Sequence, residues 1–314
     1  MQRLFKCLED CVHMSALADF KNYVNQFSEV TKWFMCSDYC IDDSTKPNDV
    51  ITFVLYPYVF DFPDWKAIMN GLQQTDFKDC KHISGDFAKF CHSGLIFSVS
   101  FILEKNNILK LFFNNRTAMQ NLSDTYIDMM NTWKTTTPSN AEHYADMQKR
   151  LRQLKESMRQ KNFQFKLLGR IVMTVFLASY LRFMLIRELD TLEIFSWLSD
   201  RDNITSFHNS IYEVLYEIGA WCMCEKNITD GKHSRVRELM LKNLEQNIFY
   251  DEMNRSADLI CGGLASYDCA AGAVTKDKHV ELLEDVIADN PYIIVLDVQE
   301  KFIGRAVISR LPKE

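Results

Sequence analysis

The segment "SADLICGGLASYDCAAGAVTKDKHVELL", residues 256–283, contains two aspartates, Asp258 and Asp277, separated by a small-residue apolar stretch and a short β-like run. Carboxylates brought together at the ends of neighbouring elements bind Mg²⁺ or Mn²⁺ and leave coordination positions open for water and phosphate. Such an ion stabilises the charge that develops during phosphodiester hydrolysis. A simpler interpretation places Asp258 near a helix N-terminus and Asp277 in an exposed turn or at the start of the next helix. The residues alone leave both interpretations open.

A second pair of residues that could take part in catalysis is Arg201 and His208 in "RDNITSFH". Their spacing spans about two helical turns, which would place both side chains on one face. There the arginine could bind phosphate and the histidine could act as acid or base on the RNA 2′-OH. The pair resembles the R-x4–6-H motif of HEPN ribonucleases, which implies metal-independent cleavage within a helical bundle. The sequence around it, "SDRDNITS", is more typical of a loop and N-cap than of a helix interior.

A strongly basic helix is predicted at "PSNAEHYADMQKRLRQLKESMRQK", where Ser139 and Glu142 would form a capping box. The cations in and just after it are Lys149, Arg150, Arg152, Lys155, Arg159, Lys161, Lys166 and Arg170. A run of this kind is most often the solvated face of a helix. If the protein binds nucleic acid, however, Arg152, Lys155 and Arg159 are the expected phosphate contacts, because cations along one helix can follow a backbone.

The composition limits the class of protein. The chain has 314 residues, of which 47% are hydrophobic and 25% charged, as in a globular protein with a full core. The net charge of −6 argues against a surface built entirely for nucleic acid but permits a local basic face. The ten cysteines form no CxxC pair and follow no signal peptide, so we expect reduced thiols in a cytoplasmic protein. No Walker, G-x-S-x-G or HExxH motif supports a nucleotide hydrolase, serine hydrolase or zinc protease.

The elements that must position these residues follow from hydrophobic periodicity. Residues 1–35 read as one or two amphipathic helices, and "VITFVLYPYVFDF" and "GLIFSVSFILEK" read as strands. Between the two strands, "PDWKAIMNGLQQ" begins like a helix with Pro63 in its first turn. Residues 108–250 read as almost entirely helical, and the apolar run from Ile171 to Leu181 is about half of the roughly 20 residues that span a membrane, so it predicts a buried helix. After residue 255 the pattern is α/β and ends with the strand "YIIVLDV".

The segment 256–283 resembles the C-terminal half of PIN-domain nucleases, in which an acid opens an Ala/Gly-rich helix, a short strand follows, and a Thr-x-Asp turn supplies another acid. Asp258 and Asp277 fall on those two positions. The resemblance implies two more acids in the N-terminal half. Asp61 in "YVFDFPDWKAI" and Glu104 in "SFILEKNN", 43 residues apart, match them, with Asp64 as the alternative to Asp61.

This resemblance implies an α/β fold with a PIN-like parallel sheet, a large all-helical insertion and a helical N-terminal extension. The expected segments are 1–47 for the extension, 48–107 and 255–314 for the two halves of the α/β domain, and 108–254 for the insertion. Asp61, Glu104, Asp258 and Asp277 would hold Mg²⁺ or Mn²⁺ in an endonuclease that acts on RNA. Many members of the family are toxins or act in phage defence, which implies a neutralising protein partner or a homo-oligomer. The competing class is a non-enzymatic helical interaction protein.

Overall fold

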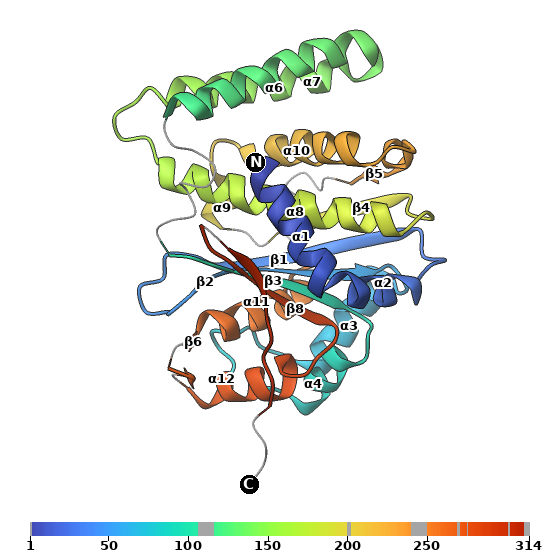
Figure 1. Ribbon diagram of the computed structural model, residues 1–314, viewed down its shortest axis with the longest axis vertical. Helices are drawn as coiled ribbons and strands as arrows, with labels where there is room; N and C mark the ends of the chain where they lie inside the picture. The colour runs from blue at the N-terminus through green and yellow to red at the C-terminus, as the bar shows by residue number, and fades with distance from the viewer. Residues whose placement is uncertain are drawn as a thin grey trace. The chain divides into compact units, whose positions relative to one another are not determined.

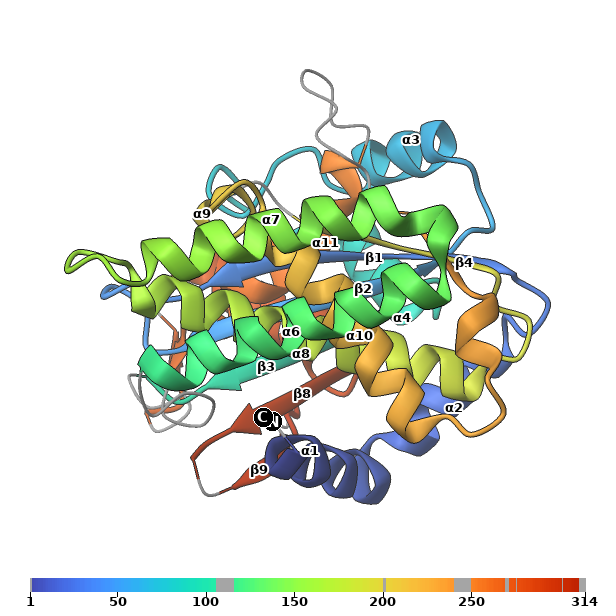
Figure 2. The same cartoon turned by 90° about the horizontal axis from the view of Figure 1, so that it is seen from above.

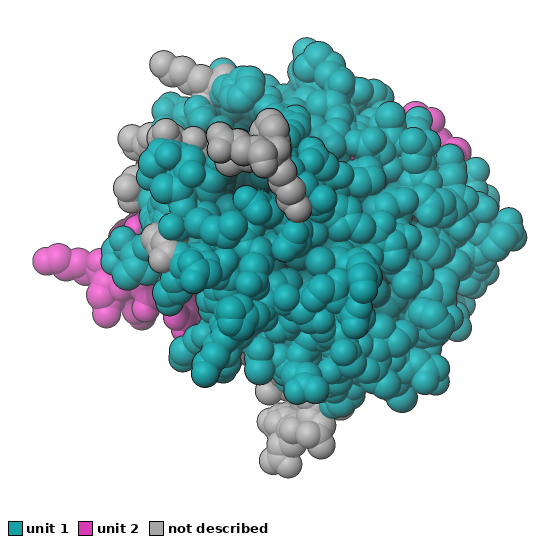
Figure 3. Space-filling model, turned by 90° about the horizontal axis from the view of Figure 1, so that it is seen from below, with its two compact units in different colours: residues 1–108, 185–200, 234–314 teal, residues 109–184, 201–233 magenta. Residues whose placement is uncertain are grey.

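The computed structural model describes residues 2–105, 116–199, 202–239, 250–268, 271–274, 276–300 and 302–310. The chain divides into two compact units, shown in Figure 3. Unit 1 comprises residues 1–108, 185–200 and 234–314, and unit 2 comprises residues 109–184 and 201–233. The helical segment predicted at 108–254 is therefore interrupted, because residues 185–200 belong to the unit that contains the sheet.

Unit 1 is built on a seven-stranded sheet with the order β5-β4-β1-β2-β3-β8-β9, as far as the described residues go (Figure 1). Its strands are β1 Lys32–Cys40, β2 Asp49–Pro57, β3 Phe97–Leu103, β4 Ile194–Ser199, β5 Arg237–Glu238, β8 Ile293–Val298 and β9 Ile303–Ala306. The pairings β1–β4, β4–β5 and β3–β8 are parallel, whereas β2 and β9 run antiparallel to every strand they pair with. The α/β class is confirmed, but β2 makes the sheet mixed. A separate short hairpin joins β6 Tyr267–Asp268 to β7 Ala273–Val274.

The strands that the sequence predicted are those buried along their length. Every residue of β2 and β3 is buried, and both read as Val-, Ile- and Phe-rich runs. β1 lies in the segment predicted to be a helical extension, where Lys32, Ser37 and Asp38 interrupt its apolar run. β4, "IFSWLS", is six residues long and follows a buried helix, so it was included in the helical segment. The predictions for 1–47 and for an all-helical 108–254 are wrong at these two strands.

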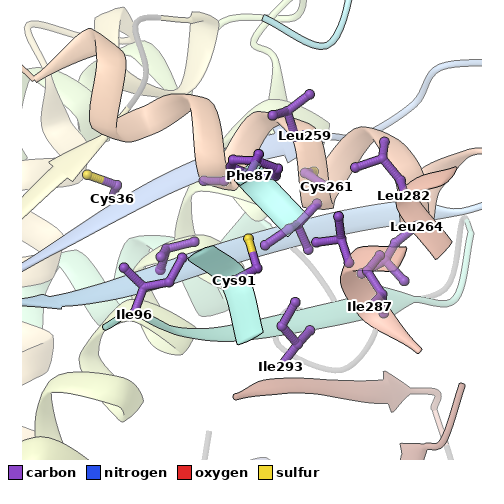
Figure 4. Close-up of a cluster of buried hydrophobic side chains, with 14 of the residues drawn as sticks. Cys36, Phe87, Cys91, Ile96, Leu259, Cys261, Leu264, Leu282, Ile287 and Ile293 are labelled. Carbon is purple, nitrogen blue, oxygen red and sulfur yellow. The ribbon is translucent and has the colours of Figure 1, made fainter. Parts of the chain in front are cut away.

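Helices cover both faces of the sheet within unit 1 (Figure 1). They are α1 Gln2–Ser15, α2 Leu17–Asn25, α3 Phe62–Leu72, α4 Gly85–His92, α11 Asp251–Ala265 and α12 Asp277–Glu281, which continues into the π-helical segment η3 Leu282–Ile287. α2 packs on one face, where the Tyr23 hydroxyl donates to Leu55 O at 3.3 Å and its ring lies 4.9 Å from that of Phe97. On the other face, α3, α4, α11 and η3 enclose a hydrophobic cluster with β1, β2, β3 and β8, part of which is drawn in Figure 4.

α11 is the central helix of that second layer and crosses β1 and β2. Its sheet-facing side is completely buried; these residues are Met253, Ala257, Ile260, Cys261 and Leu264. Two hydrogen bonds fix its position, from the Tyr56 hydroxyl to Met253 O at 2.8 Å and from Cys261 Sγ to Val50 O at 3.5 Å. Since each fully buried Leu or Ile contributes about 1.5–3 kcal/mol, this face is a major source of stability in unit 1.

Unit 2 is helical in its described residues. It contains α6 Arg116–Thr136, α7 Ala141–Ser157, most of α8 Phe165–Glu188, α9 Asn203–Ser206 and α10 Ile211–Asn227, with short turns at Pro138–Asn140 and Lys232–Arg235. α6 and α7 lie side by side (Figure 2). The capping box predicted at Ser139 and Glu142 is wrong, because Asn140 is the N-cap of α7 and no side chain caps it.

α8 is the one helix in the described ranges long and apolar enough to cross a membrane, with a mean hydropathy of 1.5 over its most apolar window. In the structure, 94% of that window is buried. The helix thus has the surroundings of a core helix, as its flanking Arg170 and Arg182 predicted.

The closest approach on the outer side of α11 is between Gly262 and the ring of Phe77, which leads to a stability prediction. A Cβ at position 262 would lie 2.5 Å from two atoms of that ring. We expect Gly262→Ala to destabilise the protein by about 1–3 kcal/mol, because Phe77 must move out of its packed position. Gly71→Ala is the matched control in α3, where a Cβ meets nothing within 4 Å and the gain in helix propensity is up to about 1 kcal/mol. Urea unfolding of both variants measures the difference; equal stability of the two would contradict this packing.

Candidate functional site

Two of the four predicted metal ligands lie at opposite edges of the sheet. Asp61 follows the C-terminal end of β2 and is the N-cap of α3, where its Oδ1 accepts a hydrogen bond from Asp64 N at 3.0 Å. Glu104 follows β3, and its Oε2 accepts from Glu300 N at 2.9 Å beside the β8–β9 turn. Because β2 and β3 pair antiparallel with Asp49 opposite Leu103, the length of β2 separates the two acids, on the order of 25 Å. One ion cannot bind both, and Asp64 lies in the first turn of α3 with Asp61.

Asp258 lies in the middle of α11, not at a helix N-terminus as predicted. Its Oδ2 accepts a hydrogen bond from Phe77 N at 2.5 Å. One turn earlier on the same helix, Arg255 donates to Asp76 at 2.9 Å and to Gln73 O. α11 therefore holds the connection between α3 and α4 against its outer side, and Asp258 is one of the groups that hold it.

Asp277 is exposed and is the first residue of α12, as the simpler interpretation predicted. The next residue, Lys278, is buried, and its Nζ donates to Phe77 O. The two segments that contain Asp258 and Asp277 therefore meet at one residue, Phe77, whose N–H and C=O they bind separately. The contact that joins them is made by Lys278, not by the carboxylate of Asp277.

Another acid on the sheet face that α11 covers is Asp38 of β1. Alternate residues of a strand face the same side, and Cys36 and Cys40 on either side of Asp38 pack into the cluster beneath α11. Asp38 pairs with Thr52 of β2, whose hydroxyl lies 2.8 Å from that of Ser100 on β3. A polar row thus crosses three strands under the helix.

Both carboxylates influence the thiol of Cys261. Burial raises the pKa of its thiol well above the usual range, and Asp38, Cys40 and Asp258 raise it further. Burial also raises the pKa of Cys40 to about 11, with Lys46 opposing and Asp43, Asp38 and Asp49 adding to the shift. Both thiols therefore stay protonated at neutral pH, and two carboxylates from distant parts of the chain act on one buried sulfur.

A polar stripe on α11 accompanies these acids. Tyr250, Asn254, Asp258 and Cys261 recur at spacings of four, four and three residues, which places them along one face of the helix. The Tyr250 hydroxyl donates to Ser199 O at the C-terminal end of β4, at 3.4 Å. Asn254 is only 6% exposed, yet within the described structure neither its Oδ1 nor its Nδ2 has a hydrogen-bond partner. A buried amide without partners costs stability, so its retention is typical of a group that binds a ligand.

The donor chemistry fits a hard divalent cation. Within the described ranges, no three His, Cys, Asp or Glu side chains converge on one metal position. Mg²⁺ is commonly bound through only one or two carboxylates together with substrate phosphate oxygens, so a site for it needs fewer protein ligands than three. The neighbouring thiols Cys40 and Cys261 do not favour a soft metal, because the thiolate is the ligand and their pKa values are raised.

The basic helix predicted to contact phosphate is α7. Lys155 pairs with Asp124 at 2.5 Å, and Arg159 pairs with Glu156 at 2.9 Å, whereas Arg152 is exposed. Two of the three predicted contacts are therefore partly neutralised within unit 2.

The Arg201–His208 pair does not have the predicted helical geometry. Arg201 lies outside the described residues, and α9 ends at Ser206, before His208. His208 has a φ of 45° in the turn before α10, and its ring lies 4.5 Å from that of Phe207 and 5.7 Å from that of Phe163. Burial lowers its pKa. This is the environment of a packed aromatic side chain.

Neither the PIN nor the HEPN resemblance has a counterpart among the known proteins compared. No family model, curated protein or solved structure matches the chain. The chemistry of the candidate site therefore follows from the side chains that the fold brings together, above all Asp38, Asn254 and Asp258.

The side-chain amide of Asn254, which has no hydrogen-bond partner among the described residues, leads to a stability prediction. We expect Asn254→Leu to leave stability unchanged or to raise it by up to about 1–3 kcal/mol, since it removes a buried polar group that has no partner. Asn290→Leu is the matched control, because Asn290 is equally buried but donates to Cys91 O and Val286 O and accepts from Tyr292 N. Thermal unfolding should show a loss of stability only in the control. A comparable loss in both variants would mean that Asn254 has a structural role.

Proposed function

We propose that this protein is a divalent-metal-dependent endonuclease in which Asp38 and Asp258 hold Mg²⁺ or Mn²⁺. The observation that supports this most directly is that α11, which contains Asp258, packs on β1, which contains Asp38, and that both carboxylates influence the buried thiol of Cys261. The ion, when bound, would supply charge stabilisation to a phosphodiester. Independently, Asn254, one turn from Asp258, is a buried polar residue on that face whose side-chain atoms have no hydrogen-bond partner within the described part of the chain.

The side chains around the two acids suit such a site. The hydrogen bond from Phe77 N orients the carboxylate of Asp258, as outer-shell partners orient metal ligands. The strand pairing fixes Asp38 opposite Thr52. Tyr250 ties the start of α11 to the end of β4. The acids therefore project from elements whose backbone positions are fixed, which a site of defined geometry requires.

The proposed ligand set differs from the one that the sequence predicted. Asp258 is retained, Asp38 replaces Asp61 and Glu104, and Asp277 lies outside the pair. RNA is proposed over DNA on the PIN resemblance of residues 256–283 alone. A role as a toxin or defence effector, with a neutralising protein partner or a homo-oligomer, belongs to the same proposal and has the same basis.

The proposal is tested by isosteric removal of each carboxylate. We expect Asp38→Asn and Asp258→Asn each to reduce Mg²⁺- or Mn²⁺-dependent cleavage of RNA at least about a hundredfold, the upper end of what loss of an outer-shell partner costs. Both amides keep the shape of the side chain, and the amide oxygen introduced at position 258 can still accept from Phe77 N, so the variants should fold. Cleavage should stop in EDTA and leave 5′-phosphate ends. Calorimetric titration with Mn²⁺ gives a second readout that does not depend on knowing the substrate.

Asp61→Asn is the control, because asparagine is an equally good N-cap for α3 and the proposal gives this acid no metal. Glu104→Gln should likewise retain activity. Full activity of Asp38→Asn would remove the proposed site, and metal-independent cleavage that is lost in His208→Ala would favour the HEPN-like alternative. If the protein cleaves no nucleic acid and calorimetry detects no Mn²⁺ binding, the interaction-protein alternative is favoured.

A further inference from the structure

Phe77, which is partly buried, is held by several contacts within unit 1. Its N–H donates to Asp258, its C=O accepts from Lys278 Nζ, and its ring stacks on that of His279 at 5.2 Å and 13°. The other side of the ring packs against the backbone at Gly262. These contacts fix the ring and both peptide groups, so Phe77 forms a rigid support immediately beside Asp258.

Lysine side chains gather around this ring. Lys278 Nζ lies 4.4 Å and Lys46 Nζ 5.0 Å from its centroid, within the range of cation–π attraction. Lys46 belongs to the loop between β1 and β2 and also donates to Ser266 Oγ. Lys276, two residues before Lys278, is exposed. We call Lys46, Lys276 and Lys278, with Phe77, the lysine cluster.

The charges of the lysine cluster act on one another. Burial lowers the pKa of Lys278, and Lys276 and Lys46 lower it further, whereas Cys80 and Asp258 oppose the shift. Burial also lowers the pKa of His279 to about 4, with contributions from Lys46, Lys278 and Lys276, so this imidazole is neutral at neutral pH. The nearby acid Glu281 is bonded to Ile83 N and to His82. Three ammonium groups therefore lie here, and carboxylates offset their charge only in part: Asp258 acts on Lys278, and the pKa of Asp43 is lowered mainly by its hydrogen bonds with Thr45 and further by Lys46.

This concentration is costly unless an anion offsets it. Lys278 is only 8% exposed, and removing an ammonium group from water beside two like charges is unfavourable. The structural contacts do not require three lysines. Lys278 alone binds Phe77 O, and a neutral donor could replace Lys46 in its hydrogen bond to Ser266 Oγ. Phosphate is the anion whose charge and oxygen acceptors match several adjacent ammonium groups, and Lys binds it as a point charge.

We propose that the lysine cluster binds a phosphate group of a nucleic-acid strand and holds it next to Asp258. This inference rests on the proposed function, because it takes the strand to be the substrate of the site formed by Asp38 and Asp258. The lysines bind charge and not base edges, so the cluster contributes affinity without sequence preference. It also assigns substrate binding to loops of unit 1, and not to α7.

The test is RNA binding without catalysis. Fluorescence anisotropy with a labelled single-stranded RNA in EDTA measures binding by the wild type and by the double variant Lys46→Gln/Lys276→Gln, which leaves the buried Lys278 in place. We expect the double variant to bind about tenfold more weakly, and its salt slope to fall by up to about 0.7, the value for one neutralised phosphate of a single strand. Lys21→Gln/Lys89→Gln removes two exposed lysines elsewhere in unit 1 and should leave both values unchanged.

Further measurements separate the possible outcomes. Inorganic phosphate should compete only weakly; if it binds tightly to the wild type and the double variant keeps wild-type RNA affinity, the site takes free phosphate and the strand proposal is wrong. Arg152→Gln in α7 should not change binding; a larger loss there than in the double variant would also overturn it. Asp38→Asn should still bind RNA in EDTA, so a failed metal site and a failed lysine cluster give different results. If the double variant proves unstable, Lys276→Gln alone, at an exposed position, should show half the change in slope.

Discussion

The packing of α11 across β1 and β2 is the contact on which the rest of unit 1 depends. One side of this helix buries an uninterrupted apolar surface on the sheet, and hydrogen bonds to Tyr56 and Val50 set where the helix lies along β2. Since a helix has fixed angular spacing, that placement also decides where its other sides point. Asn254 and Asp258 then lie over the end of β1, and Gly262 faces Phe77.

Asp258 lies between two groups of side chains that differ in charge. On one side it influences the protonated thiol of Cys261, as Asp38 of β1 also does. Toward the α3–α4 connection it binds Phe77 N, beside three lysines. A phosphodiester needs both: a cation held by carboxylates at the reacting group and fixed positive charge for its neighbouring phosphate. The adjacency of the two groups connects the proposed activity with the proposed phosphate site.

The distribution of basic residues shows why a count of cations is a poor guide to an anion site. α7 has the densest run of Lys and Arg, but Lys155 and Arg159 face carboxylates of their own unit. The lysine cluster has fewer cations, drawn from two distant loops, and its mutual repulsion at Lys278 is opposed by Asp258 and Cys80. The electrostatic potential depends on which charges stay unbalanced after folding, not on how many are present.

The sequence by itself determined the elements whose residues all face the interior. β2, β3 and β8 were predicted because an apolar run buried on both faces needs no knowledge of its neighbours. α3 was predicted from Pro63 in its first turn, although only Trp65 and Met69 of this helix are buried. The sequence also singled out Asp258, because an acidic residue is unusual within a segment of small, apolar residues. β1 was missed because Lys32, Ser37 and Asp38 interrupt its apolar run, so the pattern of a buried strand is incomplete.

Only the tertiary structure decided which acids meet. Asp61 and Glu104 have the separation that the resemblance requires, but the antiparallel pairing of β2 with β3 places them at opposite edges of the sheet. Asp38 and Asp258 have no relation in the sequence, and both influence Cys261 because a helix near the end of the chain buries its apolar face on a strand near the start. The lysine cluster arises in the same way, from loops that α11 and Phe77 hold together. Side-chain type and local spacing are encoded along the chain, whereas the meeting of distant groups is set by strand direction and by which apolar surfaces are buried together.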